Sequence, residues 1–290
     1  MQVGAFNLIE PLPELRNPHA IAILRPWIDV GNVGHLTLKL LEEHFHAQVM
    51  AELRRPGTFF DFTRYRPTVR HLHGERIVTI PNTYISFARR TDGNDLVFLN
   101  LLEPHMFGEV YARSVLKVLD ILGVKRYCLV GGMHDAVPHT RPLLVSGTAP
   151  AEMGVKLQSY GVQPSEYEGP TTIALLISQD ALKHDIEVIT LIVHLPQYTQ
   201  LEEDYSGLAR LLDIICPMQD LPIDLQRIKS KGKEQYKQVT EAVKQEPKFE
   251  QVIQQLENLY ESQRRGFNIE VSSLSPDIEK FLKEIDSNFS

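Results

Sequence analysis

The sequence contains only two cysteines, Cys128 and Cys216, and neither lies in a CxxC pair or at the spacing of metal ligands. We therefore expect a reducing compartment, the cytoplasm. Long apolar runs are missing too, since none approaches the ~20 residues that a membrane-spanning helix needs. The first residues carry Glu10 and Glu14 with prolines between them, and no basic start precedes an apolar stretch, so no secretory signal is expected. These absences predict a soluble protein that does not bind membranes.

An excess of positive charge is also absent. The 290 residues carry 30 Lys and Arg against 37 Asp and Glu, which gives a net charge of −7. Such a chain has no overall attraction for phosphate backbones or anionic lipids, and no cluster of basic residues with interleaved aromatics changes this. Binding to nucleic acid is therefore not expected. The 43% of apolar and 23% of charged residues are typical of a globular protein with a buried core.

Complete catalytic and cofactor motifs are lacking as well. Ser86, Ser114 and Ser146 do not lie in a G-x-S-x-G elbow, and neither cysteine has an obvious histidine neighbour in the sequence. The eleven histidines include no H-x-x-x-H pair with a following carboxylate, and no glycine-rich loop carries the Gly-Lys-Ser/Thr of a P-loop. Neither a metal nor a cofactor is predicted.

What the sequence does contain is a regular alternation of strand and helix patterns from residue 19 to about residue 215. Strands are predicted over 19–25, 47–53, 95–101, 126–130 and 186–194, and helices over 33–44, 107–122, 149–159, 171–184 and 201–215. A short β-hairpin is predicted over 66–72 and 76–80. The alternation predicts an α/β fold with a largely parallel sheet that helices cover on both faces.

The composition changes after residue 220, where the chain becomes highly charged. Two amphipathic helices joined at Glu246-Pro247 are predicted to form a helical hairpin. A shorter helical pattern follows, with Ile278, Phe281, Leu282 and Ile285 at its apolar positions. The predicted organisation is an α/β core over 1–220, a charged helical hairpin over 221–266 and a C-terminal tail over 267–290.

Two candidate sites follow predicted strands in the first half of the chain. The segment 29–34 (DVGNVG) opens a helix, so its backbone N–H groups can hold an anion, or Asp29 or Asn32 can cap the helix. Further along, Glu103-Pro104-His105 follows another strand. Glu103 and His105 can act as an acid–base pair, although adjacent residues rarely point at one place, and Pro104 suits the first turn of a helix.

Two more candidate sites follow in the second half. In the segment 134–142 (HDAVPHTRP), Arg141 suits a bidentate carboxylate or phosphate and His139 can exchange protons near neutral pH. The alternative is an ordered structural loop in which Arg141 pairs with Asp135 or with backbone. In the segment 167–172 (YEGPTT), Thr171 or Thr172 can cap the next helix, while Glu168 faces the same rim as Arg141 and can pair with it.

Taken in order, these segments resemble the proteasome assembly chaperone family of the second-subunit type, in its bacterial and archaeal branch. The resemblance lies in PWIDVGNVG at 26–34, LEPH at 102–105, VPHTRP at 137–142, SGTA at 146–149, YEGPT at 167–171 and the strand that runs into VHLP at 193–196. It covers about residues 5 to 262, and VPHTRP and YEGPT together are its most specific part.

The resemblance implies a three-layer α/β/α sandwich similar to the purine nucleoside phosphorylase and hydrolase-like fold, within a homo-oligomer that is trimeric in bacterial relatives. It also implies action without ATP, since the eukaryotic members are ATP-independent chaperones for the proteasome α-ring. On the matching motifs, a polar rim along one lip of the domain would hold Asp29, Asn32, Glu103, His139, Arg141, Glu168 and Thr171. The chain ends in Asn288-Phe289-Ser290, which lacks the hydrophobic-Tyr-any ending by which several archaeal relatives dock on proteasomes.

We therefore predict a non-enzymatic, ATP-independent protein-interaction or assembly-chaperone-like protein that forms a homo-oligomer, with a trimer favoured, and acts on a protein client. The alternative is a small-molecule hydrolase or nucleoside-phosphorylase-like enzyme that uses the rim around His139, Arg141 and Glu168. A rim whose side chains satisfy one another favours the first prediction, and an anion held by Arg141 and the amides of Gly31–Gly34 favours the second.

Overall fold

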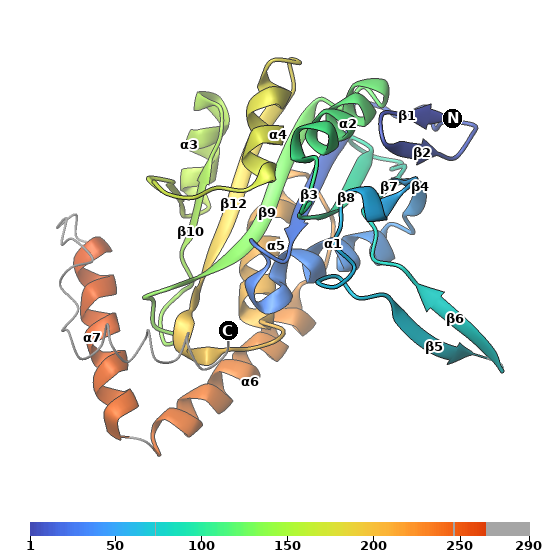
Figure 1. Ribbon diagram of the computed structural model, residues 1–290. Helices are drawn as coiled ribbons and strands as arrows, with labels where there is room; N and C mark the ends of the chain where they lie inside the picture. Colours follow the sequence, from blue (N-terminus) through green and yellow to red (C-terminus); the bar gives the residue numbers. More distant parts are fainter. Residues whose placement is uncertain (73, 246, 265–290) are drawn as a thin grey trace. The chain divides into compact units, whose positions relative to one another are not determined.

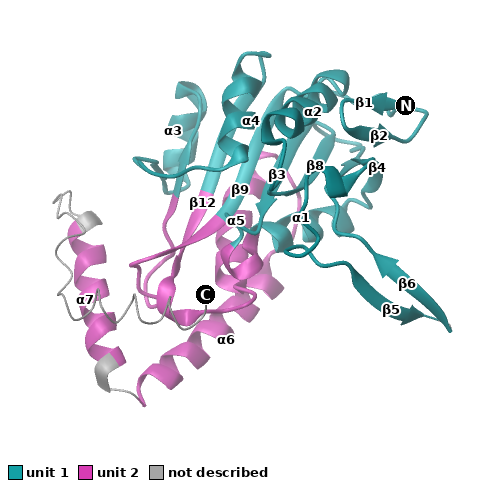
Figure 2. Ribbon diagram, in the orientation of Figure 1, with its two compact units in different colours: residues 1–29, 34–131, 146–191 teal, residues 30–33, 132–145, 192–290 magenta. Residues whose placement is uncertain are grey.

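The computed structural model describes residues 1–72, 74–245 and 247–264 (Figure 1). The chain forms two compact units (Figure 2). Unit 1 comprises Met1–Asp29, Gly34–Gly131 and Ser146–Leu191, and unit 2 comprises Val30–Val33, Gly132–Val145 and Ile192–Ser290. The predicted helical hairpin therefore belongs to unit 2, whereas the predicted tail lies outside the described residues.

Ten strands form one sheet, in the order β1-β2-β4-β7-β8-β3-β9-β12-β10-β11. Their bounds are β1 Gln2–Val3, β2 Phe6–Leu8, β3 His19–Arg25, β4 Gln48–Leu53, β7 Tyr84–Ala88, β8 Leu96–Leu102, β9 Arg126–Asp135, β10 Val145–Thr148, β11 Val162–Pro164 and β12 Glu187–Pro196. Strands β9, β10 and β12 begin in one unit and end in the other, so the chain runs between the units within these strands.

The sheet is mixed. Strand β3 pairs in parallel with β8 and β9, as the strand–helix alternation predicts. The pairs β1·β2, β2·β4, β4·β7 and β7·β8 are antiparallel. The prediction of a largely parallel sheet missed this half because the short strands β1, β2 and β7 lack a strong period, and β7 inserts antiparallel between β4 and β8.

Seven helices accompany the strands in the described residues: α1 Val33–His44, α2 Gly108–Ile121, α3 Ala151–Ser159, α4 Ile173–Leu182, α5 Tyr205–Met218, α6 Gln226–Val243 and α7 Pro247–Arg264. Short 3-10 turns lie at Val30–Asn32, Pro56–Thr58 and Gln197–Thr199. The α/β class and each of the predicted helices before residue 264 are confirmed. No helix in this described part of the chain is long and apolar enough to cross a membrane.

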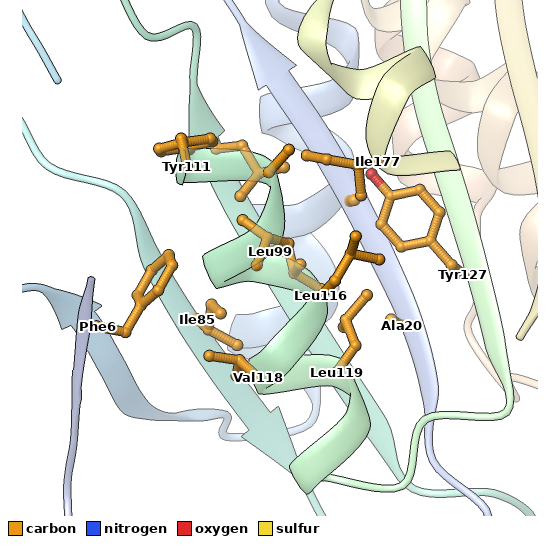
Figure 3. Close-up of a cluster of buried hydrophobic side chains, with 14 of the residues drawn as sticks. Phe6, Ala20, Ile85, Leu99, Tyr111, Leu116, Val118, Leu119, Tyr127 and Ile177 are labelled. Atoms are coloured by element: carbon orange, nitrogen blue, oxygen red, sulfur yellow. The ribbon is translucent and has the colours of Figure 1, made fainter. Parts of the chain in front are cut away.

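In unit 1, helices cover both faces of the sheet. On one face, Ala20 of β3 and Leu99 of β8 pack with Tyr111 and Leu119 of α2 in one apolar cluster (Figure 3). On the other face, Ile23 of β3 contacts α1 so closely that a Cβ at Gly34 would lie 2.1 Å from the Ile23 Cδ1 atom. Successive side chains of a strand point to opposite faces, so the apolar run of β3 fills both layers. Unit 1 therefore has three layers, with the sheet between α2 on one face and α1 on the other.

The predicted β-hairpin is confirmed and stands apart from the main sheet. Strands β5 (Thr68–Leu72) and β6 (Glu75–Thr79) pair antiparallel with each other and form a separate two-stranded sheet. All ten of their residues are exposed. Within unit 1 the hairpin extends away from the ten-stranded sheet (Figure 1).

In unit 2, helices α6 and α7 form the predicted helical hairpin, and α7 begins at Pro247. One apolar cluster joins α7 to the turn that follows β12. Its buried members are Tyr198, Val252, Ile253, Leu256 and Leu259, and Val239, Val243 and Phe249 pack against them. The apolar positions of α7 therefore pack within their own unit, which is the usual role of an amphipathic face.

Candidate functional site

The seven residues predicted from the sequence are divided between the two units. Asp29, Glu103, Glu168 and Thr171 belong to unit 1, and Asn32, His139 and Arg141 belong to unit 2. Each unit therefore has its own set of polar contacts. The loop segment 137–142, between β9 and β10, holds two of the seven residues, His139 and Arg141.

His139 in this loop segment is buried and fully hydrogen-bonded. Its Nδ1 atom lies 2.7 Å from the hydroxyl of Tyr198, which also accepts the His139 backbone N–H at 2.8 Å. On the other side, Nε2 lies 3.0 Å from Oγ1 of Thr240, which itself donates to the carbonyl of Tyr236. The Thr240 oxygen must then accept from the ring, which places the imidazole proton on Nε2 and makes Nδ1 the acceptor of the Tyr198 hydroxyl.

The electrostatic setting of His139 agrees with a neutral ring. Burial lowers the pKa of His139 below its ordinary value, although the carboxylate of Glu257 opposes this shift. The rings of Tyr198 and Tyr236 also meet the imidazole edge-on, with centroids 5.7 and 5.9 Å away. Both ring nitrogens are therefore engaged by unit 2 itself.

Arg141 takes its partners from α7. Its Nε atom donates to Glu261 and its Nη1 atom donates to Glu257, both at 3.0 Å. The pKa of Arg141 is raised, mainly by the hydrogen bond to Glu261. The neighbouring hydroxyl of Thr140 also donates to Glu257. The carboxylates that neutralise Arg141 are thus neither Asp135 nor Glu168, the two partners considered from the sequence.

The same face of α7 holds the end of the loop segment. The Tyr260 hydroxyl donates to the carbonyl of Pro142 at 3.0 Å. Glu257, Tyr260 and Glu261 are three and four residues apart, so they project from one face of the helix. The loop segment is closed by α7 on one side and by Thr240 of α6 on the other.

Asp135 has a different role. Its Oδ2 atom lies 2.6 Å from Nδ1 of His194 on β12, also in unit 2. A carboxylate that orients an imidazole in this way is part of many catalytic triads. In this chain it joins the end of β9 to β12, and the sequence did not single out His194 as a partner.

Asn32 and its neighbour Gly31 lie against the start of α5. The Asn32 side chain donates to the Glu202 carbonyl at 2.9 Å, and Asp204 donates its backbone N–H to the Gly31 carbonyl at 2.8 Å. Gly31 has a φ of 60°, and a Cβ there would lie 2.9 Å from the Cβ of Asp204. Only glycine combines this backbone conformation with this close approach.

Among the described residues of unit 2, Asp204 is the most deeply buried carboxylate. One oxygen accepts the N–H of Gly207 and so caps α5, and the other accepts the hydroxyl of Tyr236 on α6, each at 2.8 Å. Burial raises the pKa of Asp204. Asp204 thus ties α6 to the N-terminus of α5.

Asp29 in unit 1 is a helix cap, as one of the two sequence interpretations predicted. Its Oδ1 atom accepts the N–H groups of Gly34 at 2.8 Å and of His35 at 3.1 Å, at the start of α1. Burial raises the pKa of Asp29 to about 6, while these hydrogen bonds and Arg25 oppose the shift. The amide groups of Gly34 and His35 therefore already bind the protein's own carboxylate.

Glu103 and His105 point to different partners. Glu103 accepts the N–H of Ile173 at the start of α4, at 3.3 Å, and burial raises its pKa. The Nδ1 atom of His105 accepts the backbone N–H of Asp61 at 3.2 Å, and its ring packs on Tyr65. The structural interpretation of this pair fits these contacts.

The remaining two predicted residues, Glu168 and Thr171, precede α4. Thr172, the alternative cap named from the sequence, accepts the N–H of Ala174 with its hydroxyl at 3.2 Å. Thr171 and Glu168 are exposed. A surface cavity of about 730 Å³ in unit 1 is lined by Phe60, Phe62, Arg64, His105 and Met106, among others, and by none of the seven predicted residues.

Sequence reasoning missed the groups that satisfy the predicted ones. They are Tyr198, Asp204, Tyr236, Thr240, Glu257 and Glu261. The spacing of Glu257 and Glu261 marks one helix face, and Asp204 precedes a helix pattern. Neither signal identifies Arg141 or Tyr236 as the contact, because that depends on tertiary packing.

In unit 2, the polar side chains of the candidate site therefore bind one another. A neutral imidazole held at both nitrogens and a guanidinium held by two carboxylates brace the loop segment 137–142 between α6 and α7. Within the described residues, no group of three or more His, Cys, Asp or Glu side chains is placed to hold a metal ion.

Solved structures from several organisms share this fold. A protein of unknown function from Corynebacterium glutamicum ATCC 13032 is 20% identical, with 91% of this chain and 99% of that chain covered and a TM-score of 0.79. A proteasome-assembly chaperone homologue from Mycobacterium tuberculosis is 24% identical, with 81% and 99% covered and a TM-score of 0.71. An archaeal proteasome activator from Pyrococcus furiosus is 18% identical, with 83% and 99% covered and a TM-score of 0.63.

No curated protein matches the chain. The model of the PAC2 family, in contrast, matches residues 23–243, which include parts of both units and every motif segment of the resemblance in full. The match confirms the family resemblance drawn from those motifs. This chain belongs to the PAC2 family.

Proposed function

We propose that this protein is a non-catalytic, ATP-independent, self-associating protein that binds a protein client in the manner of an assembly chaperone. The observation that carries the proposal is that the polar side chains of the loop segment 137–142 are hydrogen-bonded to other residues of the same unit. His139 and Arg141, the two groups best suited to chemistry, are held by Tyr198, Thr240, Glu257 and Glu261. A small anion that approaches Arg141 would meet the carboxylates of Glu257 and Glu261, which repel it and compete with it for the guanidinium.

The independence from ATP is supported by the start of α1. The amides of Gly34 and His35 bind the carboxylate of Asp29, so this helix N-terminus is not free for a phosphate. We also propose that the protein acts in the cytoplasm, which the two buried free thiols of Cys128 and Cys216 support.

We propose a homo-oligomer, with a trimer favoured, and a client among proteasome subunits. Relatives of the same fold support the choice of client, since one is described as a proteasome-assembly chaperone homologue and another as an archaeal proteasome activator. The exposed apolar side chains of unit 1, which include Phe107 just before α2 and Leu176 on α4, support a protein partner.

The test is affinity purification of the full chain from its native cells, followed by native mass spectrometry with and without apyrase. We expect a homo-oligomer bound at fixed stoichiometry to one protein, unchanged by the removal of ATP. Purified proteasome α subunits of the same organism should reconstitute that complex.

The competing function is a small-molecule hydrolase or nucleoside-phosphorylase-like enzyme. Recovery of the protein alone, together with turnover of a nucleoside or ester panel, would overturn the proposal if Arg141→Ala abolished that turnover. Lys233→Ala, at an exposed position of α6, is the control, because it removes one positive charge without touching the loop segment 137–142.

A further inference from the structure

The β5–β6 hairpin of unit 1, with the residues that flank it, forms an arm over residues 66–80. Two-stranded hairpins are marginally stable in water unless a third strand or a helix packs on them. Yet every residue of β5 and β6 is exposed, and the two strands form a sheet of their own. The arm has the properties of an element that another surface covers.

Apolar and basic groups share one face of the arm. Val69 and Val78 are directly opposite each other, and the next pair on that face is His71 with Arg76. Val69 and Val78 are 45% and 53% exposed. On the opposite face Arg70 is paired with Ile77. Large exposed apolar side chains next to arginines are typical of protein-binding surfaces.

The charge of the arm is opposite to that of the chain. Residues 66–80 carry three arginines and one glutamate, a net charge of +2. Because the whole chain has a net charge of −7, the other residues together carry a net charge of −9. Two copies of an acidic chain repel each other over long distances. The arm is a place where contact with an acidic segment of another copy is attractive.

The C-terminal segment over residues 266–290 has the complementary composition. It carries five acidic residues and two lysines, a net charge of −3. Its apolar residues Ile278, Phe281, Leu282 and Ile285 recur at a spacing of three and four, with Glu279 and Glu284 among them. The apolar groups match Val69 and Val78, and the carboxylates match Arg76 on the same face, while Arg70 on the opposite face adds to the positive charge of the arm.

We propose that the arm of one copy binds the C-terminal segment 266–290 of a second copy. The inference rests on the proposed self-association and names the surfaces that hold the copies together. Apolar burial supplies the attraction, and the ion pairs set which segment is chosen and make the contact sensitive to salt.

Charge reversal in the full chain tests the contact. The arm variant is Arg70→Glu/Arg76→Glu, and the tail variant is Glu279→Lys/Glu284→Lys. Arg113→Glu/Lys233→Glu is the control, because it makes the same change in net charge as the arm variant, at exposed positions of α2 and α6. Sedimentation equilibrium gives the dissociation constant for self-association, and circular dichroism confirms that each variant is folded.

We expect the arm variant and the tail variant each to weaken self-association at least about tenfold, which corresponds to the loss of a few charge pairs. The control should change it less than about threefold. A chain with both reversals should regain the original dissociation constant, since the two charges are exchanged.

An equimolar mixture of arm variant and tail variant identifies the source of the segment. Each acidic arm then meets a basic segment and each basic arm meets an acidic segment, but only between unlike copies. Restored association in the mixture supports a second copy. Restoration in the doubly reversed chain but not in the mixture would overturn it, because each arm would then bind the segment of its own copy.

The remaining outcomes separate this inference from the proposed function. An oligomer that persists unchanged in the arm variant overturns the inference and leaves the proposed self-association intact. An unaltered chain that is monomeric at all concentrations overturns the proposed self-association and this inference with it.

Discussion

Two buried aspartates show how single residues hold this chain together. Asp29 in unit 1 and Asp204 in unit 2 are 7% and 1% exposed, and each caps a helix. Their positions in the sequence indicate caps, since both precede helix patterns. Their depth and their shifted pKa values follow from packing, and these properties give two predictions at the residue scale.

Asp29→Asn should stabilise the protein at neutral pH. The folded pKa of Asp29, about 6, is above the ordinary value of 3.8, so the unfolded chain binds fewer protons between these values. The free energy of unfolding therefore falls as the pH rises from about 4 to 6, by at most about 3 kcal/mol from this group. Asparagine keeps the cap and does not ionise.

The expected gain is about 1–3 kcal/mol at pH 7 and close to zero at pH 4. Urea unfolding at both pH values measures it, with Asp92→Asn as the exposed control. A gain of the same size at both pH values would show that ionisation of Asp29 is not its cause.

Tyr236→Phe should destabilise unit 2. The substitution removes the hydroxyl that donates to Asp204 and leaves a buried carboxylate oxygen without this partner. The expected loss is about 1–3 kcal/mol in guanidinium unfolding. Tyr205→Phe is the matched control, because that hydroxyl donates to Glu203, which is exposed. Equal losses in the two variants would contradict a special role for the buried contact.

At the scale of elements, the sheet requires glycine where two backbones come close. Gly147 on β10 faces β12, and a Cβ there would lie 2.0 Å from the carbonyl oxygen of Thr190. Because that oxygen belongs to a strand backbone, it cannot rotate away as a side chain can. Gly154 in α3 has nothing within 4 Å of its Cβ position.

Gly147→Ala and Gly154→Ala should therefore have opposite effects. The first should lower the free energy of unfolding by about 2–3 kcal/mol, because the strands must separate to admit a methyl group. The second should raise it by about 0.5–1 kcal/mol, because alanine is favoured over glycine inside a helix. Thermal or urea unfolding of both variants measures the difference, and the same sign for both would contradict the close approach at Gly147.

Helices α6 and α7 show what an amphipathic pattern leaves open. Their apolar positions predict a helical hairpin, and the hairpin is present. The pattern does not say that Glu257, Tyr260 and Glu261 of α7 bind residues 140–142. A charged residue on a helix can face water or form an ion pair, and the sequence pattern is the same in both cases. Only the tertiary packing of α7 places its glutamates next to Arg141.

At the scale of the whole molecule, each of the two units contains one cysteine, whose reactivity can be used to follow the unfolding of that unit. Cys128 lies in unit 1 and Cys216 in unit 2, and both are buried. Burial raises the pKa of Cys128 to about 12 and that of Cys216 to about 11, so little thiolate forms at pH 8.

We expect Ellman's reagent to label neither thiol in the folded protein at pH 8 and both in guanidinium. Cys128→Ala and Cys216→Ala assign each signal, so the denaturant concentration at which each thiol reacts measures the opening of its unit. Rapid labelling of either thiol without denaturant would contradict its burial.

The sequence by itself determined the class of fold, most strand and helix positions in both units, and the family, because periodicity and motif order are local properties of the chain. It also indicated that Asp29 or a neighbour caps α1. Tertiary structure alone decided that β1, β2 and β7 make half of the sheet antiparallel, because short strands are selected by their neighbours. It alone decided the partners of His139 and Arg141, because those partners are about 60 to 120 residues away and a hydrogen bond depends on distance in space.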